Sequence, residues 1–407
     1  MKKHRQRGKK RHINIGLITF VVLLIAIYCL IDLTRPLPAI EAIVGPSLSP
    51  NKLPLSVAWP TSQQSAIAVL GYGLVASHGS QKQSPTASVA KVVTALAVLE
   101  QKPLKIGQQG PTITLTQADV TDYNTFVAEG GSVVRVAAGE QISEYQALQA
   151  MLLPSANNMA DSLANWAFGS IPNYIKFANK LVAGRGMHST IISDASGFSP
   201  QTVSTANDLV ILGQAALNNP VAAEIVDQKS ANVPVAGTVA NVDSLLGQDN
   251  LIGIKTGNTS QAGGCFLAAS KYTTPSGQTM TIVSSTMNAP TIVAALDQTI
   301  PLMNSIYAQI QTKTLNAGYA VASYMTPWGS EASAVTTNNL STAFLPGMTV
   351  TYQVNTEAIQ PPKALATVVG NMVYGTGKGN NTKLVLSQNL TTPSIAWRLF
   401  HPKYMFH

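Results

Sequence analysis

The sequence predicts an α/β domain that is preceded by a transmembrane helix and followed by a small all-β domain. An uncharged apolar run covers residues 13–31, strand-like and helix-like segments alternate from residue 55 to about 310, and short β-rich segments follow residue 315. The 407 residues suffice for two folded domains, and the 45% share of hydrophobic residues suffices for a large core. The composition therefore argues against a disordered chain.

The N-terminal residues have the pattern of a membrane anchor. As a helix, residues 13–31 reach roughly 28 Å, about the thickness of a bilayer core. Seven positive charges precede this run within residues 2–11, and they favour a cytoplasmic N-terminus with the remaining chain outside. A cleaved signal peptide is the alternative, but no Ala-x-Ala site directly follows the run. We predict a basic tail (1–12), an anchor (13–32) and an extended, unpacked Pro-rich linker (33–54).

Residues 55–314 form the predicted catalytic domain. Runs of β-branched and apolar residues bounded by turn residues predict strands at 65–71, 72–77, 251–256, 265–270 and 280–286. Helical periodicity predicts helices at 88–99, 143–153, 158–168, 205–217 and 291–307. The segment 111–140 is rich in Thr, Val and Gly, so it is expected to form short strands and turns.

Residues 315–407 form the predicted β-rich C-terminal domain. Strands are expected at 333–337, 349–354, 365–374 and 383–386, and Trp397, Phe400 and Tyr404 are expected to pack onto them. No amphipathic membrane helix is predicted there. The two cysteines, Cys29 in the apolar run and Cys265 in the folded region, are not expected to pair, which fits a disulfide-free protein on a bacterial surface.

One helix is predicted to carry a serine and a lysine three residues apart, Ser88 and Lys91, which places both side chains on one side. A partly buried lysine loses part of its preference for the charged form, so it can take the serine proton near neutral pH. The helix start also presents N–H groups that favour developing negative charge. The pair indicates a serine acyl-transfer enzyme without a histidine. Ser-x-x-Lys alone is a weak signal, and a second copy at residues 49–52 is kept from helix by prolines.

Two further motifs follow in order. Ser155-Ala-Asn157 comes 67 residues after Ser88, and Lys255-Thr-Gly257 comes 100 residues after Ser155. A second amine and hydroxyl can relay a proton to the leaving nitrogen and attract an anionic substrate end. Gly257 would let its strand lie close to a substrate that adds on as an extra strand. Each motif is common singly, but the three in this order are a specific signal.

These motifs and their surroundings resemble the serine-type D-alanyl-D-alanine carboxypeptidases, the low-molecular-mass penicillin-binding proteins. The resemblance covers roughly residues 60–310 and is strongest in residues 87–96, 153–160, 196–209 and 253–265. It implies a DD-peptidase fold, in which an antiparallel sheet is flanked by helices and joined to a helical subdomain. It also implies peptidoglycan stem peptides as substrate, β-lactams as covalent inhibitors, and no cofactor.

The resemblance further implies a role for each motif residue. Ser88 would be the nucleophile and Lys91 the base of acylation. Proton relay and substrate orientation would fall to Ser155, Asn157 and Lys255, and the backbone N–H groups of Ser88 and Asn258 would form the oxyanion hole. Substrate would be bound by the strand residues Thr256, Gly257, Asn258 and Thr259.

Two departures from the family pattern stand out. Many members hold the substrate carboxylate with an arginine about 35 residues after the Lys-Thr-Gly lysine, whereas residues 285–291 contain none. Lys255, Thr256 and Thr259 are expected to take this role. Many relatives also attach through a C-terminal amphipathic helix, whereas the anchor predicted here is N-terminal.

Other functions have less support. A β-lactamase needs a carboxylate base, and the one glutamate between the second and third motifs, Glu224, looks like an ordinary helix residue. A catalytically silent wall-binding scaffold would have no need of all three intact motifs. A histidine-dependent catalytic triad is not expected, because the sequence has no Gly-x-Ser-x-Gly nucleophile elbow with which His78 or His188 could act. No Cys/His cluster suggests a metal site. Outside the N-terminal tail the net charge is only +1, so a nucleic-acid partner is not expected.

Overall fold

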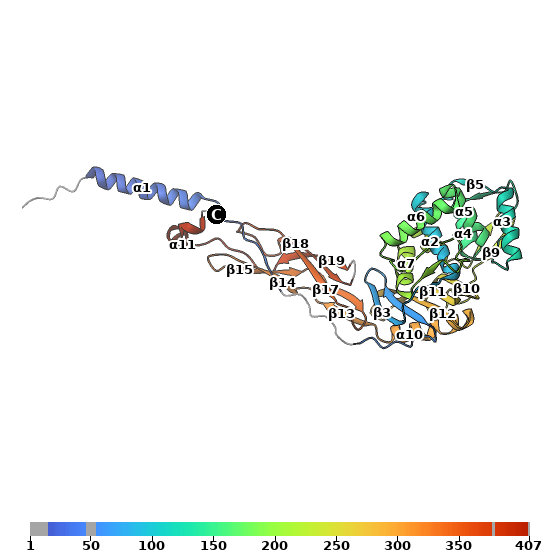
Figure 1. The fold of residues 1–407 in the computed structure, drawn as a ribbon. Coiled ribbons are helices and arrows are strands. Elements are labelled where there is room, and N and C mark those ends of the chain that lie inside the picture. The colour runs from blue at the N-terminus through green and yellow to red at the C-terminus, as the bar shows by residue number, and fades with distance from the viewer. Residues whose placement is uncertain (1–14, 46–53, 377–378, 406–407) are drawn as a thin grey trace, which may run out of the picture.

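The computed structural model describes residues 15–45, 54–376 and 379–405, and these form an elongated molecule (Figure 1). Helix α1 (Ile15–Thr34) lies at one end, the β-rich C-terminal residues lie in the middle, and the α/β domain lies at the other end. The predicted basic tail at residues 1–12 and the second Ser-x-x-Lys copy at 49–52 lie outside the described residues.

A five-stranded antiparallel sheet forms the centre of the α/β domain. Its order is β10 (Leu251–Thr259), β11 (Gly263–Thr273), β12 (Thr279–Ala289), β2 (Gln64–Val69) and β3 (Gly73–Gly79). Neighbouring residues on β11 face opposite sides: Cys265 and Leu267 join one apolar core, and Phe266 and Ala268 join another. Both faces of the sheet are therefore buried against an apolar core, and helices lie on both faces, as the predicted fold class requires.

Three helices cover the two faces of this sheet. Helix α7 (Ala206–Asn218) packs on β2 and β12, while α9 (Ile292–Asp297) and α10 (Thr299–Tyr307) contribute to the core on the opposite face. The predicted single helix over residues 291–307 is therefore two consecutive helices. Short two-stranded sheets pair β4 (Ser84–Pro85) with β7 (Val203–Ser204), β5 (Thr112–Thr114) with β6 (Gln141–Ser143), and β8 (Ser230–Val233) with β9 (Gly237–Ala240).

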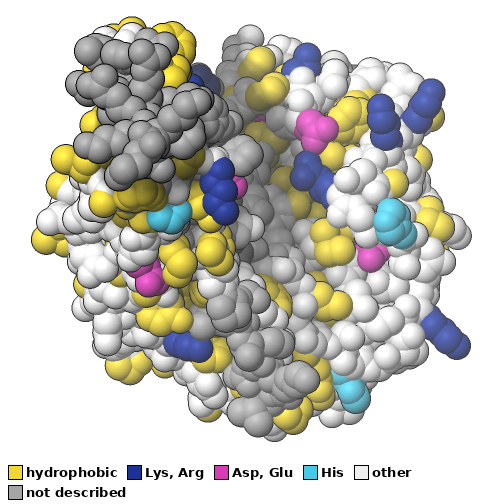
Figure 2. All heavy atoms as spheres, turned by 90° about the vertical axis from the view of Figure 1, so that its left-hand side faces the viewer, with side chains coloured by type: hydrophobic (Ala, Val, Ile, Leu, Met, Phe, Trp, Pro, Cys, Tyr) yellow, Lys and Arg dark blue, Asp and Glu magenta, His cyan; other side chains and the backbone are white. Residues whose placement is uncertain are grey.

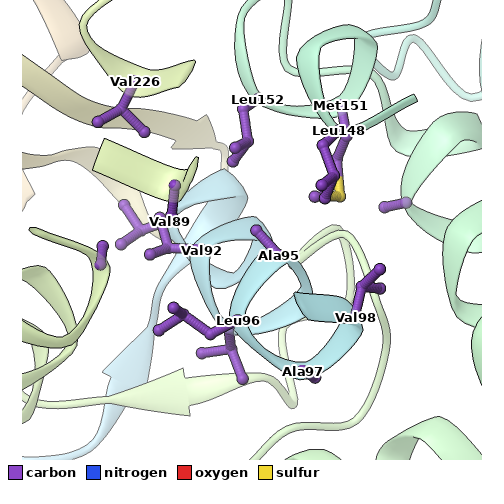
Figure 3. Packing of buried hydrophobic residues seen from close by; sticks show 14 of the residues in the cluster. Val89, Val92, Ala95, Leu96, Ala97, Val98, Leu148, Met151, Leu152 and Val226 are labelled. Atoms are coloured by element: carbon purple, nitrogen blue, oxygen red, sulfur yellow. The ribbon is translucent and has the colours of Figure 1, made fainter. Parts of the chain in front are cut away.

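Helix α2 (Lys91–Gln101) is the centre of the helical layer. Figure 3 shows Val92, Ala95 and Val98 of α2 within a cluster of buried residues that also includes Leu148 and Met151. The helices that pack on α2 are α4 (Glu144–Leu152), α5 (Asn157–Phe168), α6 (Ile171–Gly184) and α7, and α8 (Pro220–Val226) packs on α4 and α7. Nine consecutive residues of α2, from Lys91 to Leu99, are buried. Full burial of a Leu or Val side chain contributes about 1.5–3 kcal/mol, so this helix holds the position of its first residue, Lys91, firmly.

The prediction of short strands and turns across residues 111–140 is wrong for residues 117–128, which form helix α3 (Gln117–Ala128). No residue of α3 is buried, so it shows no apolar stripe in the sequence. Its start is fixed locally instead. The Asp119 carboxylate accepts hydrogen bonds from the Thr116 backbone N–H at 2.7 Å and the Thr116 hydroxyl at 2.8 Å.

Replacing Asp119 with alanine is expected to destabilise the α/β domain by about 1–2 kcal/mol, because α3 loses its N-terminal cap. The melting temperature should fall by roughly 2–6 °C in a thermal unfolding experiment. Glu129→Ala at the other end of α3 is the control, since an exposed acid near a helix C-terminus is not stabilising. Equal melting temperatures for the two variants would show that the cap does not hold α3.

The C-terminal residues form an all-β unit. A six-stranded sheet has the order β1 (Ile43–Val44), β14 (Ala320–Met325), β15 (Glu331–Thr336), β19 (Asn380–Leu386), β18 (Val368–Gly375) and β17 (Thr351–Thr356), and β13 (Gln311–Leu315) pairs with β16 (Leu340–Phe344). The apolar core on the outer face of the α/β sheet continues into this unit, and the Thr349 N–H donates to the Tyr72 hydroxyl at 3.2 Å.

The linker prediction needs a correction, because part of the Pro-rich segment is packed. Strand β1 pairs with the edge strand β14, and Ile40 forms a β-bridge with Ile359. Leu37 and Ile40 are buried. Edge strands carry unpaired backbone groups, and the apolar residues between the prolines cover this edge.

The C-terminal end lies beside α1 (Figure 1). Figure 2 looks onto this end of the molecule, where the charged side chains are scattered and do not form one patch. Trp397 of α11 (Ile395–Phe400) packs edge-on against Trp328 with ring centroids 5.5 Å apart, and Tyr404 of the turn η2 (Pro402–Met405) lies 5.7 Å from Trp397. The Tyr28 hydroxyl donates to the Leu399 carbonyl at 2.8 Å. Phe400 is 80% exposed, so the prediction that it packs onto the domain is wrong.

Candidate active site

The first motif lies where a short 3₁₀ turn, η1 (Ala87–Ala90), runs into α2. Ser88 is half-buried in this turn, and Lys91 is fully buried as the first residue of α2. Ala87 has φ of +46°, which is uncommon for a residue with a Cβ. The chain therefore turns sharply just before Ser88, and the serine hydroxyl stays accessible above a buried amine.

The Lys91 amine is the centre of the site's hydrogen bonds. Its Nζ donates to Ser88 Oγ at 2.9 Å, to Asn157 Oδ1 at 2.7 Å and to the Ser196 carbonyl at 2.9 Å. Burial lowers the pKa of Lys91 well below its usual value, and the nearby charge of Lys255 lowers it further. The neutral amine is thereby favoured, and a neutral amine at this distance can accept the serine proton.

The second motif lies in the turn between α4 and α5. Ser155 is 5% exposed and has φ of +68°, and Asn157 is the first residue of α5. The Asn157 N–H donates to the Ser132 carbonyl at 2.7 Å, which ties this turn to the segment after α3. Within the described residues Ser155 Oγ makes no hydrogen bond to either lysine of the site.

The third motif lies on β10, the edge strand of the central sheet. Lys255 is 2% exposed and its Nζ donates to the Thr256 carbonyl at 3.1 Å. Burial lowers the pKa of Lys255 to about 7, and Asp243 opposes this shift. A Cβ on Gly257 would lie 2.9 Å from the Ser88 backbone nitrogen, so glycine lets β10 lie directly against η1.

The last two predicted substrate-binding residues are at the end of β10. Asn258 is exposed and Thr259 is half-buried. The Thr259 hydroxyl accepts from the Ala262 N–H at 3.1 Å and so supports the turn into β11. On β12, the Asn288 side-chain amide donates to the Ala262 carbonyl at 2.9 Å and braces the same turn.

A loop outside the three motifs supplies one hydrogen-bond acceptor for the Lys91 amine. Asp194 accepts from the Ser196 N–H, the Ser196 hydroxyl and the Phe198 N–H, which fixes the Ser196 carbonyl in place. Gly197 has φ of +76°, and a Cβ there would lie 1.9 Å from the Ala87 carbonyl. The Ser196-Gly197-Phe198 sequence is part of the family resemblance, but it does not reveal that the Ser196 carbonyl accepts from Lys91, because a backbone acceptor does not depend on the residue type.

The other possible nucleophiles and general bases have structural roles. Burial raises the pKa of the Cys265 thiol to about 11, so it is not an activated nucleophile. His78 stacks on Trp59 with ring centroids 5.5 Å apart. Glu224 is hydrogen-bonded to the Tyr145 hydroxyl.

Two aspartates lie on helices of the α/β domain. Asp208 lies in the first turn of α7 and accepts from the Ser189 N–H at 2.8 Å. Asp161 lies within α5, one turn after Asn157, and burial raises the pKa of its carboxyl group to about 7.

A half-exposed serine beside a buried lysine, on a sheet covered by helices, is the arrangement of a serine acyl-transfer enzyme without histidine. A model of the D-alanyl-D-alanine carboxypeptidase family matches residues 68–291, more than half of the chain. The protein therefore belongs to this family of serine peptidases. The matched range contains all three motifs.

Individual relatives agree with this assignment. The chain is 32% identical to the D-alanyl-D-alanine carboxypeptidase DacB2 of Mycobacterium tuberculosis over 191 residues, which cover 46% of this chain and 62% of that protein. It is 25% identical to the carboxypeptidase DacA of Haemophilus influenzae over 354 residues, 83% of this chain and 87% of that one. The fold is similar to penicillin-binding protein 5 of Haemophilus influenzae, with a TM-score of 0.59, 21% identity, and coverage of 83% of this chain and all of that one.

Proposed function

We propose that this protein removes the terminal D-alanine from peptidoglycan stem peptides through an acyl-enzyme on Ser88. The observation that carries the proposal is the buried Lys91 amine, 2.9 Å from the Ser88 hydroxyl, with its pKa lowered well below the usual value. Family membership supports the substrate class. Residues of this chain can carry out both steps of the reaction, the acylation of Ser88 and the hydrolysis of the acyl-enzyme.

In the first step the neutral Lys91 amine takes the Ser88 proton, and Ser88 Oγ attacks the carbonyl between the last two D-alanines. The Ser88 N–H, against which Gly257 packs, and the Asn258 N–H stabilise the oxyanion. The proton passes to the leaving nitrogen through the Lys91, Ser155 and Lys255 groups, and D-alanine leaves. Water then hydrolyses the ester, which frees Ser88.

Substrate is bound alongside β10. This strand pairs with β11 on one side only, so its other edge can pair with an extended peptide. In this chain, which lacks the family arginine, Lys255, Thr256 and Thr259 hold the terminal carboxylate. Asn157 holds a substrate carbonyl or amide, while its Oδ1 keeps Lys91 in place.

The protein acts outside the cytoplasmic membrane, held by α1. Residues 16–34 of this helix are long and apolar enough to cross a bilayer, with a mean hydropathy of 2.6. The positive charges before it favour a cytoplasmic N-terminus. The Pro-rich segment and the C-terminal sheet then connect the membrane to the catalytic domain.

One assay tests the proposed function. The purified full chain in detergent is mixed with a fluorescent penicillin and, separately, with a peptide ending in D-Ala-D-Ala, and a Ser88→Ala variant measures the background. A persistent label and release of D-alanine are expected. Rapid turnover of the drug would instead indicate a β-lactamase, and no label with no release would leave a non-catalytic wall-binding protein.

A further inference from the structure

The Lys91 amine has two partners that can only accept a hydrogen bond. They are the Asn157 amide oxygen at 2.7 Å and the Ser196 carbonyl oxygen at 2.9 Å, and the third partner is the Ser88 hydroxyl at 2.9 Å. A neutral amine has two N–H groups and one lone pair, whereas an ammonium has three N–H groups. When Lys91 is neutral, its two N–H groups are therefore taken by Asn157 and Ser196, and its lone pair is left for the Ser88 proton.

One carboxylate closes the loop that supplies the Ser196 carbonyl. Asp194 Oδ2 accepts from the Ser196 hydroxyl at 2.8 Å, from the Phe198 N–H at 2.9 Å and from the Ser196 N–H at 3.2 Å. Asp194 Oδ1 accepts from the Thr202 hydroxyl. The donors lie on both sides of the Ser196 carbonyl along the chain, so this carboxylate determines where the carbonyl points.

The same loop is attached to α2 at two consecutive carbonyls. The Thr94 hydroxyl donates to the Ala195 carbonyl at 2.6 Å, and Lys91, one turn earlier on α2, donates to the Ser196 carbonyl. Thr94 is fully buried, and its hydroxyl is also hydrogen-bonded to the Tyr174 hydroxyl at 2.7 Å. The loop and α2 therefore have one fixed register, which sets the direction from which the carbonyl meets the Lys91 amine.

The loop also lies against the turn that carries the nucleophile. A Cβ on Gly197 would lie 1.9 Å from the Ala87 carbonyl and 2.8 Å from Ala90 Cβ. Ala87 and Ala90 are the first and last residues of η1, which contains Ser88. Because the loop contacts both η1 and α2, it fixes its acceptor relative to the serine as well as to the lysine.

We infer that Asp194 is a positioning residue for the proposed reaction: it holds the Ser196 carbonyl so that the lone pair of the neutral Lys91 amine is directed at the Ser88 hydroxyl. The inference rests on the proposed function. As Ser88 Oγ attacks the substrate carbonyl, its proton moves onto this lone pair. The resulting ammonium keeps two of its N–H groups on Asn157 and Ser196, so the proton just received is the one free to pass on toward the leaving nitrogen.

The charge of Asp194 acts on Lys91 in the opposite sense to its hydrogen bonds. Burial and the charge of Lys255 lower the pKa of Lys91, whereas the Asp194 and Asp161 carboxylates favour its charged form. Removing the Asp194 charge therefore favours the free amine and does not withdraw the base. A slower reaction in a variant at this position then reports the lost position of the Ser196 carbonyl.

The experiment measures labelling of the full chain in detergent over a range of concentrations of a fluorescent penicillin. The limiting rate at saturating drug reports the chemistry, the half-saturating concentration reports binding, and the final labelled fraction reports the share of folded molecules. Asp194→Ala should lower the limiting rate roughly 10- to 100-fold, the cost of a misplaced catalytic group, with an unchanged half-saturating concentration. Asp194→Asn keeps an oxygen acceptor for the loop donors and should recover most of the wild-type rate.

Asp208→Ala is the matched control. The Asp208 carboxylate is buried and also holds a loop, since it accepts from the Ser189 N–H and the Thr190 hydroxyl at 2.8 Å each. Neither of these two residues is hydrogen-bonded to Lys91 in the part of the chain that the structure describes. This variant should melt at a lower temperature than the wild type but label at the wild-type limiting rate.

Thr94→Val gives a second test that leaves the carboxylate in place. It removes one of the two attachments of the loop to α2 and should lower the limiting rate about 2- to 10-fold, the size of one hydrogen bond. If Asp194→Ala does not fold, the Thr94→Val rate decides: a fall supports the inference, and the wild-type rate overturns it.

Support for the inference is a low limiting rate with full final labelling in Asp194→Ala, recovery in Asp194→Asn and the wild-type rate in Asp208→Ala. A wild-type limiting rate in Asp194→Ala overturns it, as does a fall in the labelled fraction alone, because that is the signature of a structural role. An Asp194→Asn rate as low as that of Asp194→Ala also overturns it, since the charge would then be the cause. A wild type that takes no label overturns the proposed function, and the inference with it.

Discussion

Replacing Lys91 with methionine is expected to slow acylation of Ser88 by roughly 10²- to 10⁴-fold, the size of a general-base contribution. Methionine keeps most of the side-chain volume but removes the amine that contacts Ser88, Asn157 and the Ser196 carbonyl. Without that base the serine hydroxyl keeps its proton and is a weak nucleophile. The rate of covalent labelling by an excess of fluorescent penicillin measures the effect.

The fold of the Lys91→Met variant is checked by its melting temperature, because the substitution leaves two buried acceptors unpaired. Ser88→Ala gives the floor of the assay, since it has no atom to acylate. Lys105→Met, in an exposed loop, is the control for loss of a lysine and should label at the wild-type rate. Labelling of Lys91→Met at more than a tenth of the wild-type rate would mean that another group takes the serine proton.

Replacing Gly257 with alanine is expected to lower the acylation rate by roughly 10²- to 10³-fold, as the loss of one oxyanion donor does. The added Cβ would lie 2.9 Å from the Ser88 nitrogen, 3.0 Å from Ala87 Cβ and 3.1 Å from the Thr86 carbonyl. Two of these three atoms belong to the backbone, so β10 and η1 must move apart. The backbone itself tolerates alanine, because Gly257 has an ordinary strand conformation.

A matched control for the glycine substitution is Gly184→Ala, near the end of α6. A Cβ there meets no atom within 4 Å, and alanine in a helix is more favourable than glycine by about 0.5–1 kcal/mol. This variant should label normally and melt no lower than the wild type. Normal labelling of Gly257→Ala would show that the approach of β10 to η1 is not needed for the chemistry.

The side chains of the candidate site were predicted from the sequence because the three motifs occur in a fixed order and their residue types suit the proposed chemistry. The spacing of Ser88 and Lys91 alone predicted that they face each other, and their atoms are 2.9 Å apart. The Ser196 carbonyl could not be predicted in the same way, because it is a backbone atom that a separate loop brings to Lys91.

The fold, too, was predictable from the sequence only in part. Strands with two buried faces and helices with an apolar stripe were predictable, as for β11 and α4. Helix α3 was not, because none of its residues is buried and its β-branched residues favour strands. The pairing of β1 with β14 was also missed, since prolines nearby indicate an extended chain but do not reveal which sheet edge it meets.

The elongated shape has a consequence for which substrates can be cut. Helix α1 and the C-terminal residues lie together at one pole, while Ser88 lies in the domain at the other (Figure 1). With α1 in a bilayer, the intervening sheet acts as a spacer of fixed length. Under the proposed anchoring and function, tethered molecules trim stem peptides only within a band at one height above the lipid, and changing the length of this spacer would move that band.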